Sequence, residues 1–384
     1  QVSELLNKKD VKFQKRIEFK AGLNFLSKLD EYITFAIENY FESKDLWING
    51  RLIPEWFMKE KFQAYPDMPI YERLNKIVKD IETNIGIHYN HDISAEERAE
   101  IKTQVKKMFK FTTLRSLYKN FYAWLEKSNL CKFNRDGSLE YSDVFPLIYL
   151  KMHCEKVKIF EDVKHLMIDE MQDYTAVQYA VLSKLFPCKK TILGDSNQSV
   201  NPISASSSAD IQKVFTNSDC VKLCKSYRST YEITQFAQRI SPNTDLEAIK
   251  RHGHPPSILN FDNSEEELQQ ILKIVEEFRN SDLHSLGIIC RSQSEAEEFY
   301  KRIKPEDFKS YFLSTQSDVF RQGIVVCSAH MAKGLEFDHV IVPYVSAENY
   351  TSQIDRKMLY VACTRAMHKL TLTHTGDVSS LIKQ

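Results

Sequence analysis

The sequence has few glycines and no long apolar run. Only ten of its 384 residues are glycine, which argues against a linker or a disordered tail and favours a helix-rich folded protein. No apolar run approaches the ~20 residues of a membrane-spanning helix. The start QVSELLNKKD has no signal-peptide core. We therefore expect a cytoplasmic protein without a membrane anchor, and the absence of an initial Met predicts a fragment or a processed product.

Net charge and paired cysteine motifs are also missing. The 52 basic residues balance the 52 acidic ones, so a nucleic-acid partner would have to be met by a local patch. The eight cysteines include no C-x-x-C pair, which predicts reduced thiols and no zinc site. A chain of this length exceeds what one hydrophobic core serves, so two or three domains are expected.

The first third of the chain shows helical periodicity with few breakers, and residues 1–135 are predicted to be all-helical. Its stripes include Phe25, Leu26, Leu29, Tyr32, Ile33, Ala36, Ile37 and Tyr40. A second apolar stripe runs through 102–127, with basic residues largely off it. Those basic residues either contact nucleic acid or form an ordinary solvated helix face, and the sequence leaves both open.

From about residue 140 the pattern changes to short apolar runs alternating with helical stretches. The runs are HLMID, KTILGD, CVKLC, SILNF, LGIIC, GIVVCS, HVIVPY and LTLTH. Runs of this length and composition predict parallel strands in an α/β fold, buried on both faces. The proline-containing stretch 241–258 is predicted to be a linker between two α/β units.

Two polar clusters follow two of these runs. In IDEMQD, Asp169 could hold Mg²⁺ and Glu170 could orient and deprotonate an attacking water, as phosphoryl transfer requires. The alternative is a pair of acids that cap the next helix. In GDSNQ, a turn-forming glycine precedes Asp195, and the amide of Gln198 could sense a γ-phosphate.

These clusters resemble motifs II and III of the superfamily 1 helicases of the UvrD, PcrA and Rep type. KSYRST (225–230) is similar to motif IV, SAHMAKGLEFD (328–338) to motif V, and LYVACTRA (359–366) to motif VI. The resemblance covers roughly 140–384. It implies RecA-like parallel sheets, ATP and Mg²⁺ as cofactors, and DNA as a partner.

The resemblance also implies roles for the arginines and tyrosine of motifs IV and VI. Tyr227 would stack on adenine, unless it is a buried core residue. Arg228 and Arg365 would stabilise the γ-phosphate in the transition state, unless they form surface salt bridges.

Five residues of motif V receive roles in the same way. Glu336 would accept hydrogen bonds from the ribose, and Lys333 with Gly334 would shape the turn. His330 and Ser328 are weak nucleic-acid candidates, and His330 could equally well pack inside the protein.

Three departures from the family pattern narrow this interpretation. No G-x-x-x-x-G-K-S/T loop exists to hold the phosphates, so we expect a C-terminal segment cut after that loop. The stretch SVNPISASS holds no aromatic residue to stack on single-stranded bases. Only about thirty residues separate GIICRS from GIVVCS, too few for a second large accessory domain.

The spacing and the stretch LEYSDVFPLIYLKMH (139–153) look most like HelD, the RNA polymerase-associated branch. The prediction is a helical insert (1–135), the second half of RecA-like domain 1A with motifs II to IV (136–245), and domain 2A with motifs V and VI (246–384). It is expected to be a monomer that remodels RNA polymerase complexes. The alternatives are a 3′-to-5′ DNA helicase or translocase and a non-catalytic binding module.

Overall fold

The computed structural model describes residues 11–133, 136–155, 157–195, 198, 207–303, 308–317 and 323–382. The chain forms two compact units, 1–194 with 203–218, and 195–202 with 219–384. The segment 225–230 and the stretch 241–258 therefore both lie in the second unit. The three-part division at 135 and 245 remains a prediction about domains.

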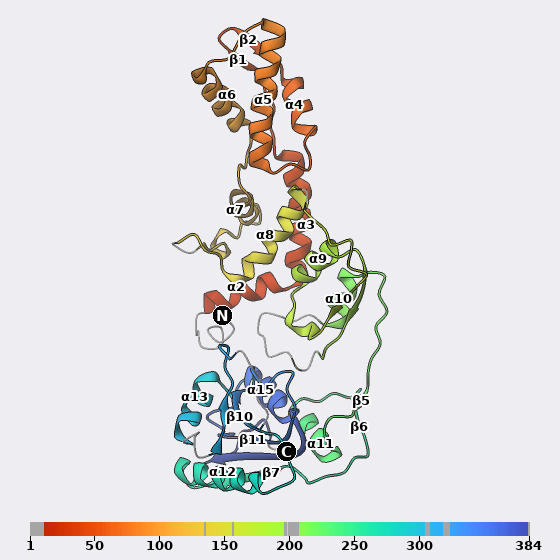
Figure 1. Ribbon diagram of the computed structural model, residues 1–384, viewed down its shortest axis with the longest axis vertical. Helices are drawn as coiled ribbons and strands as arrows, with labels where there is room; N and C mark the ends of the chain where they lie inside the picture. The colour runs from red at the N-terminus through yellow and green to blue at the C-terminus, as the bar shows by residue number, and fades with distance from the viewer. Residues whose placement is uncertain are drawn as a thin grey trace. The chain divides into compact units, whose positions relative to one another are not determined.

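The first unit is mainly helical (Figure 1). Its helices are α2 (Val11–Ala21), α3 (Leu23–Asn39), α4 (Glu55–Gln63), α5 (Ile70–Tyr89), α6 (Ala95–Met108), α7 (Leu114–Trp124), η1 (Ser128–Leu130), α8 (Tyr141–Cys154), η2 (Met171–Asp173), α9 (Ala176–Leu185) and α10 (Ser208–Val214). Two parallel strands, β3 (His165–Ile168) and β4 (Lys189–Ile192), pair in this unit.

The prediction that 1–135 is all-helical is wrong at one place. Strands β1 (Leu46–Ile48) and β2 (Arg51–Ile53) form an antiparallel hairpin. Its turn residues Asn49 and Gly50 have φ of +47° and +77°, the left-handed conformations that a two-residue hairpin turn requires. The hairpin is a separate two-stranded sheet.

The apolar stripe over 102–127 belongs to two helices rather than one. Helix α6 ends at Met108, where Phe109 is extended and bridges to Phe41. Helix α7 then begins behind a capping box, in which Thr113 and Ser116 exchange hydrogen bonds. The break arises because the extended backbone at Phe109 is paired with another segment instead of continuing the helix.

The second unit is built on a six-stranded parallel sheet. Its order is β7 (Ser257–Phe261), β12 (Ala366–Thr375), β11 (Phe337–Val342), β8 (Leu286–Cys290), β10 (Ile324–Ser328) and β9 (Tyr311–Phe312). All residues of β8 and β10 are buried, as expected for a parallel sheet covered on both faces. The fold class is therefore α/β, as predicted.

Helices cover this sheet in two groups. Helices α12 (Ser264–Arg279) and α13 (Gln293–Arg302) share a hydrophobic core with alternate residues of β8 and β10. Helices α11 (Tyr231–Ile240) and α15 (Gln353–Cys363) contact each other, and both contact β12. No helix in the described ranges is long and apolar enough to cross a membrane.

One predicted strand is absent. CVKLC (220–224) is not in a strand, and only Lys225–Ser226 (β5) pairs with Glu247–Ala248 (β6). The side chains of Val221 and Leu223 are 82% and 85% exposed. An apolar β-rich run without a neighbouring strand has no ladder to join, which explains the failure of the prediction.

A buried ion-pair cluster joins α2 to α8. Lys20 Nζ lies 2.7 Å from Asp143 Oδ1, and both side chains are at most 2% exposed. Arg16 pairs with Glu140 at 2.7 Å, and the Tyr118 hydroxyl donates to Asp143 at 2.6 Å. Burial raises the pKa of Asp143, and Lys20 opposes that shift. Lys20 thus offsets part of the cost of burying this carboxyl group.

We expect Lys20→Met to destabilise the first unit by about 3–5 kcal/mol, because it leaves the Asp143 carboxylate buried without its cation. The matched control is Lys28→Met, whose exposed partner is Glu31, and which should cost less than about 0.5 kcal/mol. Urea unfolding followed by tryptophan fluorescence measures both, since Trp47, Trp56 and Trp124 all lie in this unit. Equal effects would contradict the argument.

Candidate functional site

The first acidic cluster lies directly after β3. Asp169 is exposed, and its Oδ1 accepts a 2.8 Å hydrogen bond from the Glu170 N–H. Glu170 has φ +54° and ψ +52°, a left-handed conformation that is costly for a residue with a side chain. The strand therefore ends in a sharp turn, and the carboxylates of Asp169 and Glu170 point in different directions.

Gln172 holds the second of these carboxylates. It is 1% exposed, and its Nε2 donates to Glu170 Oε2 at 2.5 Å. Gly194 lies against it, since a Cβ there would come within 2.5 Å of both Gln172 Oε1 and Met171 N. Only glycine allows the end of β4 to approach this turn so closely.

Backbone hydrogen bonds tie the ends of β3 and β4 together. Leu193 N donates to Ile168 O, and Met171 N donates to Leu193 O, both at 2.8 Å. Parallel register pairs Ile168 with Ile192. The two segments that the sequence marked as polar clusters thus begin side by side at the carboxyl end of this sheet, where α/β folds bind ligands.

Asp169 suits a magnesium ion. Mg²⁺ usually takes one or two protein carboxylates and fills its other positions with water and phosphate oxygens. An exposed carboxylate with one oxygen held by a backbone N–H fits that pattern. Within the described residues there is no group of three or more His, Cys, Asp or Glu side chains that could hold a metal ion by themselves.

A second polar cluster, in the other unit, is centred on Arg365. Its side chain is 1% exposed, and its Nη2 donates to Gln198 Oε1 at 2.5 Å. It also donates to the carbonyl oxygens of Val361 at 3.2 Å and Leu335 at 3.3 Å. Gln198 Nε2 donates to Asp195 Oδ2 at 3.1 Å. Asp195, Gln198 and Arg365 therefore form one hydrogen-bonded chain.

Tyr360 on α15 is a further member of this neighbourhood. Burial, and secondarily the negative charge of Asp195, raise its pKa to about 12, while Arg365 acts in the opposite direction. Its hydroxyl therefore stays protonated at neutral pH. The neutral Tyr360 hydroxyl adds no charge near Asp195 and Arg365. The positive charge of the Arg365 guanidinium therefore stays available for an anionic ligand.

Arg228 and Glu336 form an ion pair in the same unit. Their Nε and Oε1 atoms lie 2.5 Å apart, and the side chains are 36% and 44% exposed. The Arg228 carbonyl accepts a hydrogen bond from Arg251, which also bonds Met367 O at 3.0 Å. Tyr227 is 67% exposed. This places it outside the core, so a buried core tyrosine is excluded.

Arg228, Glu336 and Arg365 all lie near the amino ends of β11 and β12. β11 begins one residue after Glu336, and β12 one residue after Arg365, with Phe337 paired to Ala366. The Ser229 hydroxyl donates to Ala366 O at 2.6 Å. Three predicted site residues, Arg228, Glu336 and Arg365, are thus tied to one end of two neighbouring strands.

Ser328 is the last residue of β10, and residues 329–334 form the turn that follows. Gly334 has φ +79°, and Lys333 precedes it. Ser328 is 3% exposed, and its hydroxyl donates to Gln293 Oε1 at 3.0 Å, so this side chain is already engaged inside the protein. His330 is half-buried. The stretch 199–206, which holds no aromatic residue, lies outside the described residues.

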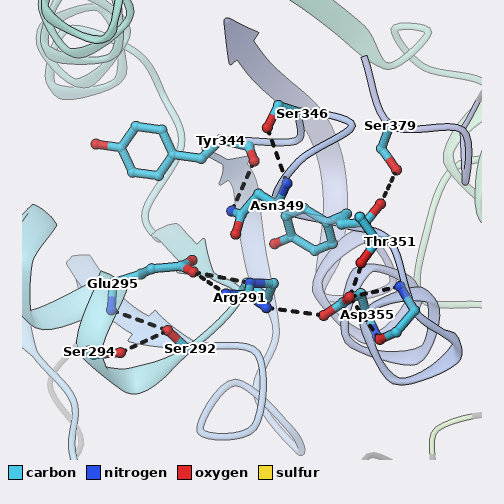
Figure 2. Close-up of polar contacts among 12 residues, drawn as sticks. Arg291, Ser292, Ser294, Glu295, Tyr344, Ser346, Asn349, Thr351, Asp355 and Ser379 are labelled. Carbon is cyan, nitrogen blue, oxygen red and sulfur yellow. Dashed lines mark hydrogen bonds and ion pairs between the residues drawn. The ribbon is translucent and has the colours of Figure 1, made fainter. Parts of the chain in front are cut away.

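A polar network fixes the start of α15, the helix that leads to Arg365 (Figure 2). Arg291 donates to Glu295 at 2.8 and 3.0 Å and to Asp355 at 3.3 Å. Asp355 also accepts from Thr351 N and from the Ser352 N–H and hydroxyl. The end of β8, the start of α13 and the start of α15 are therefore held together.

Family models match three successive stretches of the chain. The UvrD/REP helicase N-terminal domain matches 76–214, and two models of the UvrD-like helicase C-terminal domain match 221–325 and 323–373. The first range contains Glu170 and Gln198, the second Arg228, and the third Arg365. This chain belongs to the UvrD-like helicases.

Individual relatives carry helicase names. A protein of Acanthamoeba polyphaga mimivirus, named as an ATP-dependent DNA helicase, is 25% identical over 286 residues, covering 64% of this chain. This chain spans 40% of that relative. A solved structure of the C-terminal domain of a possible DNA helicase from Lactobacillus plantarum is 32% identical, with TM-score 0.35, covering 41% of this chain and 92% of the other.

Two residues of this UvrD-like helicase were missed by the sequence analysis. Gln172 was visible in DEMQD but received no role, although it orients Glu170. Tyr360 lies in LYVACTRA, and only its burial beside Asp195 and Arg365 draws attention to it. Periodicity and spacing cannot reveal either contact.

The two arginines are expected to differ in their structural importance. Arg228→Ala breaks an exposed ion pair and should change the free energy of unfolding by less than about 1 kcal/mol. Arg365→Ala leaves buried carbonyls and the Gln198 amide unsatisfied, and should cost about 2–4 kcal/mol. Differential scanning calorimetry of the two variants measures this, and equal losses would contradict the assignment.

Proposed function

We propose that this chain is the motor part of an ATP-driven UvrD-like helicase that acts on DNA. The observation that carries the proposal is the chain of hydrogen bonds from Arg365 through Gln198 to Asp195. A buried guanidinium held by an amide is the arrangement needed to respond to a γ-phosphate. The name of the mimiviral relative supports DNA as the nucleic acid.

Each group then has one chemical task. Asp169 would hold Mg²⁺, and Glu170, oriented by Gln172, would accept a proton from the attacking water. Gln198 would contact the γ-phosphate, and Arg228 and Arg365 would neutralise charge as the bond breaks. Bound ATP with Mg²⁺ supplies the phosphoryl group whose hydrolysis drives movement.

The nucleoside would be held by the exposed residues of motifs IV and V. Tyr227 is available to stack on adenine because two thirds of its surface is open. Glu336 would accept hydrogen bonds from the ribose, with Lys333 and Gly334 shaping the turn before it. In this arrangement Arg228 and Glu336 exchange their mutual ion pair for contacts with ATP.

The phosphate-cradling loop would have to come from a further segment of the protein. Among the residues that the structure describes, the sheet formed by β3 and β4 has two strands, with Met167 69% and Leu193 44% exposed. Parallel sheets are normally larger and covered on both faces. We infer that additional strands, preceded or followed by a phosphate-binding loop, complete this sheet in the active protein.

We expect the 384-residue chain alone to hydrolyse ATP at background rate, and the longer protein with a phosphate-binding loop to be active. Glu170→Gln in the longer protein should lower turnover by ~10² or more and spare ATP binding, because it removes only the base. Steady-state ATPase assays with and without single-stranded DNA measure this.

The matched control is Glu161→Gln, which changes an exposed acid before β3 and should leave turnover unchanged. Robust hydrolysis by the 384-residue chain would show that the phosphate site has been misplaced. Full activity of the Glu170→Gln protein would assign the base to another residue.

A second candidate is the HelD-like function, remodelling of RNA polymerase complexes. Two observations favour it. Between β8 and β10 the described residues hold only α13 and β9, which leaves no room for a large accessory domain. The helical region exposes Trp47 and Trp56 at 60% and 65%, and exposed tryptophans are frequent anchors of protein interfaces.

If this second function is right, the chain should bind RNA polymerase more tightly than DNA. Trp56→Ser should then weaken polymerase binding by about tenfold or more, since anchor residues carry much of the affinity. Ile354→Ser is the control, an exposed apolar residue of the second unit. Biolayer interferometry with both partners decides, and preference for DNA favours the helicase.

A further inference from the structure

A cavity of about 760 Å³ lies in the helical region of the first unit. Its lining residues come from α3 and the segment after it, α4, α5 and the end of α8. The volume is within the range of small-molecule sites, roughly 300–1,000 Å³. None of the residues assigned to ATP lines it.

One wall of this cavity is aromatic. The rings of Phe41 and Phe62 stack with centroids 4.5 Å apart and planes 13° apart. Tyr40 stacks on Phe62 at 6.1 Å, and the Arg73 guanidinium lies 5.0 Å above the Phe62 ring. A flat aromatic ligand would extend this series of stacked groups.

Two polar groups in the lining have no hydrogen-bond partner among the described residues, the Tyr40 hydroxyl and Arg73 Nε. The residues are only 5% and 7% exposed. Leaving such a donor unsatisfied costs about 1–3 kcal/mol, more when it is charged, and native proteins rarely tolerate it without a reason. Both atoms are covered, so a ligand reaches them through a small movement of neighbouring atoms.

Arg73 carries a buried positive charge bonded to carbonyl oxygens. Its Nη2 donates to Pro66 O at 2.6 Å, Met68 O at 3.0 Å and Cys154 O at 3.5 Å. No ion pair of Arg73 occurs within the described part of the chain. Carbonyl oxygens hold the guanidinium in place, and the carboxylates of Glu155 and Asp67 attract it without a close ion pair, so a bound anion could still pair with it directly.

The titratable groups around Arg73 include Tyr40, His153 and Cys154, together with the carboxylates of Glu155 and Asp67. Burial raises the pKa of the Cys154 thiol to about 11 and lowers the pKa of His153. Burial also raises the pKa of Tyr40 well above its usual range, so its hydroxyl remains a donor. The deep part of the cavity therefore presents one cation and one neutral donor.

The rim of the cavity has the opposite charge. It contains the carboxylates of Glu38, Glu42, Glu55 and Asp67 and one ammonium group, that of Lys59. Glu42 pairs with Lys44 at 3.0 Å, and Glu55 accepts from the Ser43 hydroxyl at 3.2 Å. An acidic rim repels phosphodiester chains and attracts positive charge.

We propose that this cavity binds a planar aromatic molecule with an anionic group at one end and a cationic group at the other. The anionic end meets Arg73 and the Tyr40 hydroxyl, the aromatic body stacks on Phe41 and Phe62, and the cationic end lies among the rim carboxylates. The site is separate from ATP chemistry. It gives the helical region a small-molecule ligand of its own.

Three related probes test the charge pattern on the full chain by ligand-observed NMR and calorimetry. They are 6-(aminomethyl)-2-naphthoate, 6-methyl-2-naphthoate without the amine, and 6-methyl-2-naphthylmethylamine without the acid. The first should bind with a Kd on the order of 1 mM or tighter for its size. The second should be weaker, and the third weakest, because only the acid satisfies the buried donors.

Tyr40→Phe is the decisive variant. It removes a hydroxyl without a partner among the described residues, so the fold should be no less stable, while affinity for the two acids falls about tenfold. Tyr71→Phe is the control, a 57% exposed tyrosine on α5 outside the cavity, and should bind normally. Equal affinity of all three probes, or unchanged binding by Tyr40→Phe, would overturn the proposal, as would the absence of binding.

Discussion

The pairing of parallel strands is the constraint on which both polar clusters depend. Neighbouring parallel strands have their amino ends on one side of a sheet and their carboxyl ends on the other. Residues that directly precede or follow two paired strands must therefore lie close together. In the first unit this brings the turn after β3 against Gly194 after β4. In the second unit it brings Glu336 and Arg365 to the starts of β11 and β12. Side chains more than twenty residues apart thereby become neighbours.

Burial gives side chains of the same type different roles. Arg228 and Arg365 are both arginines of helicase-like motifs, yet one forms an exposed ion pair and the other is enclosed by carbonyls and an amide. An exposed ion pair contributes little free energy, so its side chains can leave each other and bind a ligand instead. A buried guanidinium is held in one geometry, which suits a group that must respond to a small change at its site. Arg73 in the helical region resembles Arg365, because it is also buried and bonded to carbonyl oxygens.

Most of the strands of the two parallel sheets could be predicted from local pattern alone. Apolar runs of five or six residues became β3, β7, β8, β10 and β11 within two residues of the predicted places. The ends of β4 and β12 differ more, because β4 ends three residues before its run does and β12 begins four residues before its run. Two segments differ from the prediction, the hairpin turn at 49–50 and the apolar run 220–224. Asn49–Gly50 between alternating apolar residues is a strong hairpin signal that helical periodicity obscured. Val221 and Leu223 have strand-like character, but no strand in the described part of the chain pairs with them.

What the sequence by itself determined is the class of fold, the order of the five motifs and the residue types at each, because these depend on periodicity and on short fixed spacings. Tertiary structure alone decided which motif residues touch, that Gln172 orients Glu170, and that Arg365 is buried while Tyr227 is exposed. It also decided that the first unit contains a cavity with Tyr40 and Arg73 in its lining. Contacts and burial result from the packing of segments far apart in the chain, and no local pattern encodes the distance between them.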